Sequence, residues 1–146
     1  MKEQALDTHK EVLARVAEQY GLRFVILHGS FASNAADETS DIDVAILPRK
    51  RLDSEQFFKL QSDLSETFNL DGRDFDFKTL EMADPLFRYE VVSSGVLLFG
   101  DPTDFEEFKA TAFHMYEDAR PLFALEQLLS KKLQHRLENL YFKHAQ

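Results

Sequence analysis

The sequence predicts an α/β (α+β) fold, in which helices flank a small mixed β-sheet and the chain ends in a helical tail. Two observations carry this prediction. Segments with helical spacing alternate with short apolar runs, and Gly or Pro ends most of these runs. With 146 residues, 44% of them hydrophobic, the chain can bury one core. We therefore expect one domain, with its main part at residues 1–120 and a helical tail of the same domain at 121–146.

The first three expected elements are a helix and two strands. Apolar residues recur at helical spacing within residues 3–20, and Gly21 follows as a stop. Residues 23–29 (RFVILHG) and 41–48 (DIDVAILP) are short runs rich in β-branched or other apolar residues. They indicate two buried strands that lie next to each other in the chain.

A helix and a third strand follow. Phe and Leu residues three or four positions apart predict a helix that ends before Asn69. Residues 72–80 (GRDFDFKTL) then alternate between polar and apolar. In a strand, this alternation places Phe75 and Phe77 on one face and Asp74, Asp76 and Lys78 on the other.

The remaining elements are a short helix, a fourth strand and the tail. Asp84 and Pro85 are a typical helix start, and residues 96–99 (VLLF) read as a short strand. From Thr103 onward the pattern is helical, and Pro121 should kink or split this last helix.

Composition excludes several classes of protein. A net charge of −9 weighs against direct binding of a nucleic-acid backbone, which needs clustered Lys and Arg. The absence of cysteine excludes disulfides and thiolate metal sites. The charged N-terminus is unlike a signal peptide, and no apolar run is long enough to span a bilayer. We expect a soluble, cytoplasmic protein.

Three carboxylates and a Gly-Ser pair form the candidate site. Asp41 and Asp43 are two residues apart at the start of a strand, so both point to one face of the sheet. Asp76 offers a third carboxylate on a strand that can pair beside them. Such oxygen ligands suit Mg²⁺, which shares its shell with phosphate oxygens. Gly29 and Ser30 follow the preceding strand, and the backbone can make a tight turn there that approaches a phosphate closely.

Each of these features alone has a plain structural explanation. An Asp-x-Asp pair is more often a solvated strand edge, and a Gly-Ser pair is a common turn. The stretch from Asp37 to Asp43 lacks the central Gly and final Glu of a calcium-binding loop. Taken together and in this order, the features favour a metal-bridged nucleotide site in which two cations clamp an in-line displacement.

These residues also carry a family resemblance. Gly29-Ser30, then ten residues, then Asp41-Ile42-Asp43 and a later strand carboxylate in FDF resemble the motif of the polymerase-β-like nucleotidyltransferase superfamily. The short chain resembles its smallest branch, the minimal nucleotidyltransferases, over residues 3–120. The resemblance implies that Asp41, Asp43 and Asp76 hold two Mg²⁺ ions and that Asp76 helps to activate the attacking hydroxyl. Gly29 and Ser30 would contact the phosphates, and AMP would pass from ATP to a hydroxyl.

The same resemblance implies a partner in trans. We expect no second domain for a large substrate, which points to an acceptor supplied in trans. In the minimal branch the resemblance implies that this acceptor is a tyrosine of a HEPN-domain ribonuclease toxin, which would make this chain the antitoxin. Two alternatives stay open: an antitoxin that neutralises its partner by occlusion without catalysis, and a nucleotidyltransferase that acts on a small molecule such as an antibiotic.

The tail offers a candidate docking surface. Phe105, Phe108, Phe113 and Tyr116 lie on the first part of the expected last helix, where they serve either partner docking or, as we favour, the core. Residues 138–142 (ENLYF) match most of a protease-recognition tag used in expression vectors, although Lys143 follows where the tag has Gln. We base no inference on the last nine residues.

Overall fold

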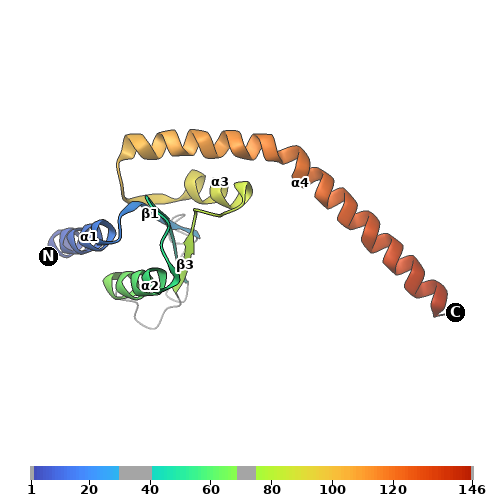
Figure 1. Ribbon diagram of the computed structural model, residues 1–146, viewed down its shortest axis with the longest axis horizontal. Helices are drawn as coiled ribbons and strands as arrows, with labels where there is room; N and C mark the ends of the chain where they lie inside the picture. Colours follow the sequence, from blue (N-terminus) through green and yellow to red (C-terminus); the bar gives the residue numbers. More distant parts are fainter. Residues whose placement is uncertain (1, 30–40, 69–74, 146) are drawn as a thin grey trace.

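The chain folds as a four-stranded mixed sheet between two layers of helices (Figure 1). The computed structural model describes residues 2–29, 41–68 and 75–145. The elements are α1 (Lys2–Gln19), β1 (Leu22–His28), β2 (Ile42–Pro48), α2 (Ser54–Phe68), β3 (Phe75–Thr79), α3 (Pro85–Ser94), β4 (Val96–Phe99) and α4 (Pro102–His144). The predicted fold class and the predicted order of elements are confirmed.

The sheet has the strand order β3-β2-β1-β4. β1 pairs antiparallel with both β2 and β4, whereas β2 and β3 are parallel. Because β2 and β3 run in the same direction, residues at the start of each strand meet at one end of the sheet. This arrangement brings the start of β2 and the start of β3 together, which is where the predicted carboxylates lie.

Each face of the sheet has its own apolar core. One face is covered by α1 and α2, and its buried residues are Leu13, Ala17, Leu22, Val25, Ile42, Val44, Ile46, Leu60, Leu64 and Phe77. The other is covered by α3 and α4, and its buried residues are Phe24, Ile26, Ala45, Leu47, Leu80, Val91, Val92, Phe105 and Ala112. Figure 1 shows α3 and α4 on one side of the strands and α1 and α2 on the other.

The termini of α3 follow from its sequence. The side chain of Asp84 accepts a hydrogen bond from the backbone N–H of Phe87 at 2.9 Å, which satisfies one of the unpaired donors at the start of a helix. Pro85 occupies the first turn, where its missing N–H costs nothing. The predicted cap and start of this helix are both confirmed.

The last helix has the extent that the sequence predicts. Pro121 lies inside α4, which continues for 43 residues without a break. Figure 1 shows α4 changing direction about halfway along its length, as expected of a proline that removes one backbone hydrogen bond. Of the two predicted effects of Pro121, a kink or a split, the helix shows the kink. Among the described residues, no helix is both long and apolar enough to cross a membrane.

The aromatic residues of the first half of α4 belong largely to the core. Phe105 is buried and meets Phe24 edge to face at 5.3 Å between ring centroids, and Phe108 packs on the same ring. Tyr116 stacks on Tyr89 of α3 at 4.6 Å. The favoured assignment of these aromatic residues to the core is therefore confirmed for Phe105, and Phe108 packs against the same core, whereas Phe113 is 44% exposed.

Candidate active site

Asp43 and Asp76 lie side by side on neighbouring strands. The parallel register pairs Asp43 of β2 with Asp76 of β3, and the antiparallel register pairs Asp43 with His28 of β1. Alternation along each strand explains this placement, because the flanking residues Val44 and Phe77 enter the core under α1 and α2. The two carboxylates consequently project from the opposite face, the one that carries α3 and α4.

Gly29 makes room for the Asp43 carboxylate. Its φ of +73° lies in the left-handed region that favours glycine, and a Cβ built at this position would overlap the Oδ2 atom of Asp43. The glycine thus allows the chain leaving β1 to pass directly against the acidic group. Ser30, the other half of the predicted pair, lies outside the described residues, as does any helix that begins just after it.

Asp41 completes the acidic group from the residue immediately before β2. Its side chain is exposed, and its negative charge contributes to the raised pKa of Asp43. The structure therefore brings Asp43 and Asp76 into direct proximity and places Asp41 beside them. Within the described residues, no three His, Asp or Glu side chains are gathered closely enough to form a complete metal site.

The electrostatics of the site show that negative charge is crowded there. Burial raises the pKa of the Asp43 carboxyl; nearby His28 opposes this rise, whereas Asp76, through its charge and a hydrogen bond, and Asp41 add to it. Burial also lowers the pKa of His28, which favours a neutral imidazole. A bound cation would relieve the repulsion among these carboxylates.

The donor set fits Mg²⁺. Magnesium in nucleotide sites is commonly held by one or two carboxylates and completed by water and phosphate oxygens, so it does not need a closed cage of protein ligands. Asp43 and Asp76 provide such a pair, and Asp41 adds a third hard oxygen donor at the exposed side. Because Gly29 has no side chain, the Asp43 carboxylate can lie directly against the backbone at the end of β1.

Two residues at this site were not assigned to it from the sequence. The Nζ atom of Lys78 lies 3.5 Å from Oδ2 of Asp76 and 5.2 Å from the ring centroid of Phe87 on α3. The ring of His28 meets Phe87 edge to face at 6.0 Å, and its buried Nε2 atom has no hydrogen-bond partner in the described part of the chain. Lys78 could have been found by alternation from Asp76, whereas His28 requires the register between β1 and β2.

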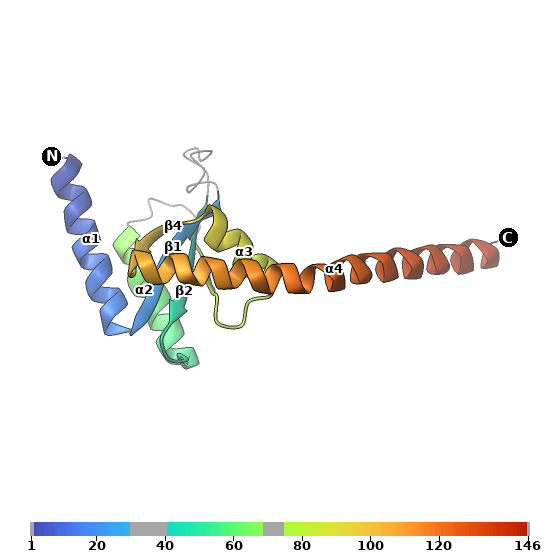
Figure 2. The same cartoon turned by 90° about the horizontal axis from the view of Figure 1, so that it is seen from above.

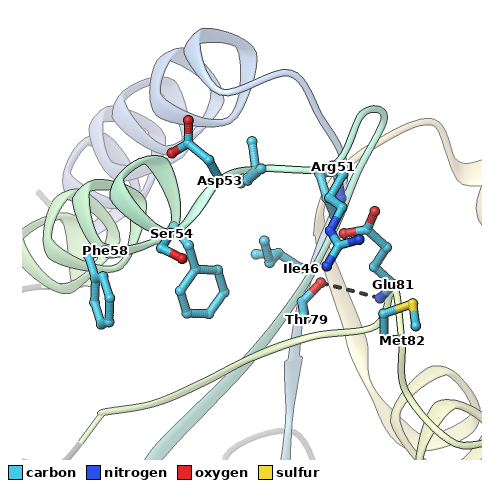
Figure 3. A pocket seen from close by; sticks show the side chains of 11 residues that line it. Ile46, Arg51, Asp53, Ser54, Phe58, Thr79, Glu81 and Met82 are labelled. Atoms are coloured by element: carbon cyan, nitrogen blue, oxygen red, sulfur yellow. Dashed lines mark hydrogen bonds between the residues drawn. The ribbon is translucent and has the colours of Figure 1, made fainter.

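A small pocket lies away from these residues. A cavity of about 270 Å³ opens at the far ends of β2 and β3, between the start of α2 and the segment after β3. Figure 3 shows Phe58, Arg51 and Met82 around it, with the Thr79 hydroxyl accepting a hydrogen bond from the backbone N–H of Glu81. This pocket contains none of the three predicted aspartates, so we do not assign it to the nucleotide.

Comparison with known proteins agrees with this geometry. Residues 11–104 match the model of the polymerase beta nucleotidyltransferase family. The protein adenylyltransferase MntA of Shewanella oneidensis is 29% identical over 96 residues, which cover 66% of this chain and 67% of MntA.

Solved structures give the same fold. A crystal structure of a toxin–antitoxin with AMP-PNP matches with a TM-score of 0.67 and 24% identity, over 86% of this chain and 98% of the other. A structure of the tri-AMPylated Shewanella oneidensis HEPN toxin in complex with MNT antitoxin matches with a TM-score of 0.63 and 23% identity, over 88% and 98% of the two chains. With the carboxylates of Asp43 and Asp76 paired across parallel strands and the family match over residues 11–104, this chain belongs to the polymerase beta nucleotidyltransferase family.

Proposed function

We propose that this chain is a Mg²⁺-dependent adenylyltransferase that moves AMP from ATP onto a hydroxyl group of a partner protein. The proposed partner is a HEPN-type ribonuclease toxin with a tyrosine as acceptor, so the chain acts as an antitoxin. The observation that carries the proposal is the pairing of Asp43 with Asp76 across β2 and β3, with Asp41 just before β2. Membership of the nucleotidyltransferase family supports it.

Relatives support the acceptor and the nucleotide. The curated relative is named a protein adenylyltransferase, and one structural neighbour pairs an MNT antitoxin with a tri-AMPylated HEPN toxin. Another neighbour contains AMP-PNP, an analogue of ATP. We place the reaction in the cytoplasm, in keeping with a chain without cysteine. Residues 1–120 form the catalytic part in this proposal, and residues 121–146 form its tail.

Each site residue has a proposed role. Asp41, Asp43 and Asp76 hold two Mg²⁺ ions, and Gly29 and Ser30 contact the phosphates of ATP. Bound Mg²⁺ supplies neutralisation of phosphate charge and a template for the attacking and leaving oxygens. The close approach of the Gly29 backbone to Asp43 and the proximity of Asp43 to Asp76 support these roles.

The transfer itself is an in-line displacement. The acceptor oxygen bonds to the α-phosphorus of ATP, the bond from that phosphorus to the bridging oxygen breaks, and pyrophosphate leaves with the electron pair. The hydroxyl proton passes to Asp76, whose side chain is 46% exposed and can therefore be reached by a partner protein. Lys78, beside Asp76, keeps that carboxylate turned toward the site.

The double variant Asp41→Asn with Asp43→Asn tests this function. It keeps side-chain volume and removes both the repulsion and the metal ligands, so it should fold at least as well as the wild-type chain. In cells that express the toxin, this variant should fail to protect, and the toxin should lack the added mass of AMP in an intact-mass spectrum.

The same experiment separates the alternatives. A non-catalytic antitoxin that works by occlusion would still protect cells, because its interface need not include these carboxylates. Full protection by a variant shown to be folded would refute the catalytic role. AMP transfer to a small molecule with no modification of any toxin would instead support the antibiotic-type alternative.

A further inference from the structure

The second half of α4 carries an apolar surface that nothing in the described chain covers. We call Leu122, Leu125, Leu129, Leu133 and Leu137 the leucine stripe; each of these side chains is at least 50% exposed. Figure 2 shows this part of α4 extending away from the sheet and the other helices. All five residues precede the segment 138–142 that resembles a vector tag, so the stripe does not depend on that segment.

Helical geometry places the five leucines on one face. They are three or four positions apart, and a helix has about 3.6 residues per turn, so the side chains form a line about 22 Å long. Lys131 lies opposite this line, and Gln134 borders it on the edge away from Lys132. A stripe of this width and length is typical of helices that pack on another helix, and an exposed apolar surface of this kind marks an interaction site.

Positive charge lines one edge of the stripe. Lys132 and Arg136 lie on the same side of the leucines, one turn apart, and neither forms an ion pair with a described carboxylate. Residues 122–137 contain three Lys or Arg and one Glu, which gives +2 and leaves −11 for residues 1–121. The stripe is therefore a basic segment of an otherwise acidic chain.

This edge disfavours a second copy of the chain as the occupant. Antiparallel pairing of two identical helices places the same edge against itself, so the basic edge of one copy would face the basic edge of the other. Parallel pairing places the basic edge against the opposite edge, where the one carboxylate, Glu126, lies more than a turn from either cation. Neither arrangement pairs the two cations, whereas a helix with acidic edges pairs both.

We infer that the leucine stripe is a docking site for an amphipathic helix of a partner protein, with an apolar stripe of its own and Asp or Glu along the edge that meets Lys132 and Arg136. The docking does not involve the nucleotide site, since every residue of the stripe lies on the part of α4 that extends away from the sheet. Docking and AMP transfer can therefore be tested separately.

The test uses the full chain and two synthetic helical peptides of equal length, with identical leucine stripes and either Glu or Lys along both edges. Fluorescence anisotropy should show the Glu-edged peptide binding about tenfold more tightly, since two edge contacts change from attraction to repulsion. At about 1 M salt, where screening shortens the Debye length to about 3 Å, this difference should largely disappear.

Matched variants locate the binding surface. Lys132→Glu and Lys131→Glu change the net charge equally, but only Lys132 borders the stripe. Only Lys132→Glu should therefore weaken binding of the Glu-edged peptide and strengthen binding of the Lys-edged peptide. Leu129→Gln with Leu133→Gln should abolish binding of both. Circular dichroism should show that each variant keeps its helix content, because none of these side chains packs in the core.

Several results would overturn the inference. Equal affinity for the two peptides, equal effects of Lys131→Glu and Lys132→Glu, or no binding of either peptide would each do so. Light scattering that gives twice the monomer mass of 16.9 kDa at the concentrations of the assay, with the dimer lost in the leucine double variant, would assign the stripe to a second copy instead. None of these results depends on AMP transfer.

Discussion

Replacement of Gly29 by alanine separates backbone strain from the function of the site. Gly29 has a φ of +73°, and an L-residue in this left-handed region costs about 1–2 kcal/mol. The added Cβ would also overlap Oδ2 of Asp43, so the carboxylate must move by about 1 Å to restore normal contact distances. A misplacement of about 1 Å can cost about 10²-fold in activity. Gly29→Ala should therefore lose most stabilisation by Mg-ATP and most AMP transfer.

Gly21→Ala is the matched control. Gly21 has a similar φ of +64°, but a Cβ at this position meets nothing within 4 Å. Both variants should lower the free energy of unfolding by about 1 kcal/mol or slightly more, which lowers the melting temperature by about 4 °C for a domain of this size.

The assay is thermal denaturation with and without Mg-ATP, because a ligand that binds the folded state raises its stability. Gly21→Ala should keep the full ligand-induced rise in melting temperature, and Gly29→Ala should lose it. If Gly29→Ala kept the full rise, the backbone at Gly29 would not lie against the nucleotide site. An equal loss in both variants would show that strain alone impairs binding.

Three further predictions concern single side chains. Asp76→Asn should leave the melting temperature nearly unchanged but remove most pyrophosphate release, because it loses a metal ligand and a base; release at the wild-type rate would show that Asp76 is wrongly assigned. Burial, and then Asp63, raises the pKa of Tyr20 to about 12, and its hydroxyl donates to Asp63 at 2.7 Å. Because the pKa in the folded state exceeds the usual value of 10.0, the hydrogen bond of Tyr20 contributes fully to the free energy of unfolding below about pH 10. This contribution is lost as the pH rises toward about 12. Tyr20→Phe should thus cost about 1 kcal/mol in urea denaturation at neutral pH and nothing at about pH 12; a loss independent of pH would contradict this. The hydrogen bond from Arg23 lowers the pKa of Asp104, so this pair stabilises the fold above the usual Asp value of 3.8 and loses its effect as the pH falls further. Asp104→Asn should lower the melting temperature at neutral pH, and this loss should shrink as the pH falls below about 3.8; a loss that does not change with pH would refute the ion-pair explanation.

Local patterns were sufficient to predict the strands of the site. In residues 72–80, polar and apolar residues alternate, and Phe77 enters the core while Asp76 faces outward. This prediction succeeds because one face of the strand is buried and the register of the whole strand follows from the apolar side chains. The start of α3 was predictable for a similarly local reason, since Asp84 bonds a backbone donor only three residues away.

The pairing of Asp76 beside Asp43 was predicted, but the neighbour of Asp43 on the other side could not be. His28 faces Asp43 only because β1 and β2 pair in one particular register, and no local pattern around His28 indicates this neighbour. The burial of apolar residues along α4 could not be predicted either. Phe105 and Leu129 both lie on apolar positions of one helix, yet Phe105 is 4% exposed and Leu129 is 56% exposed. Helical spacing identifies an apolar face, but only the path of the chain determines whether that face is covered.

The parallel register of β2 and β3 also links correct folding to activity. A shift of β3 by one residue would turn Asp76 into the apolar layer beside Phe57 and expose Phe77, whose ring now lies 4.9 Å from that of Phe57. Such a shifted chain would bury an uncompensated carboxylate and would be strongly disfavoured. Molecules that fold stably therefore keep Asp76 on the same face of the sheet as Asp43, so burial of the apolar residues on one face determines where the acidic group lies on the other.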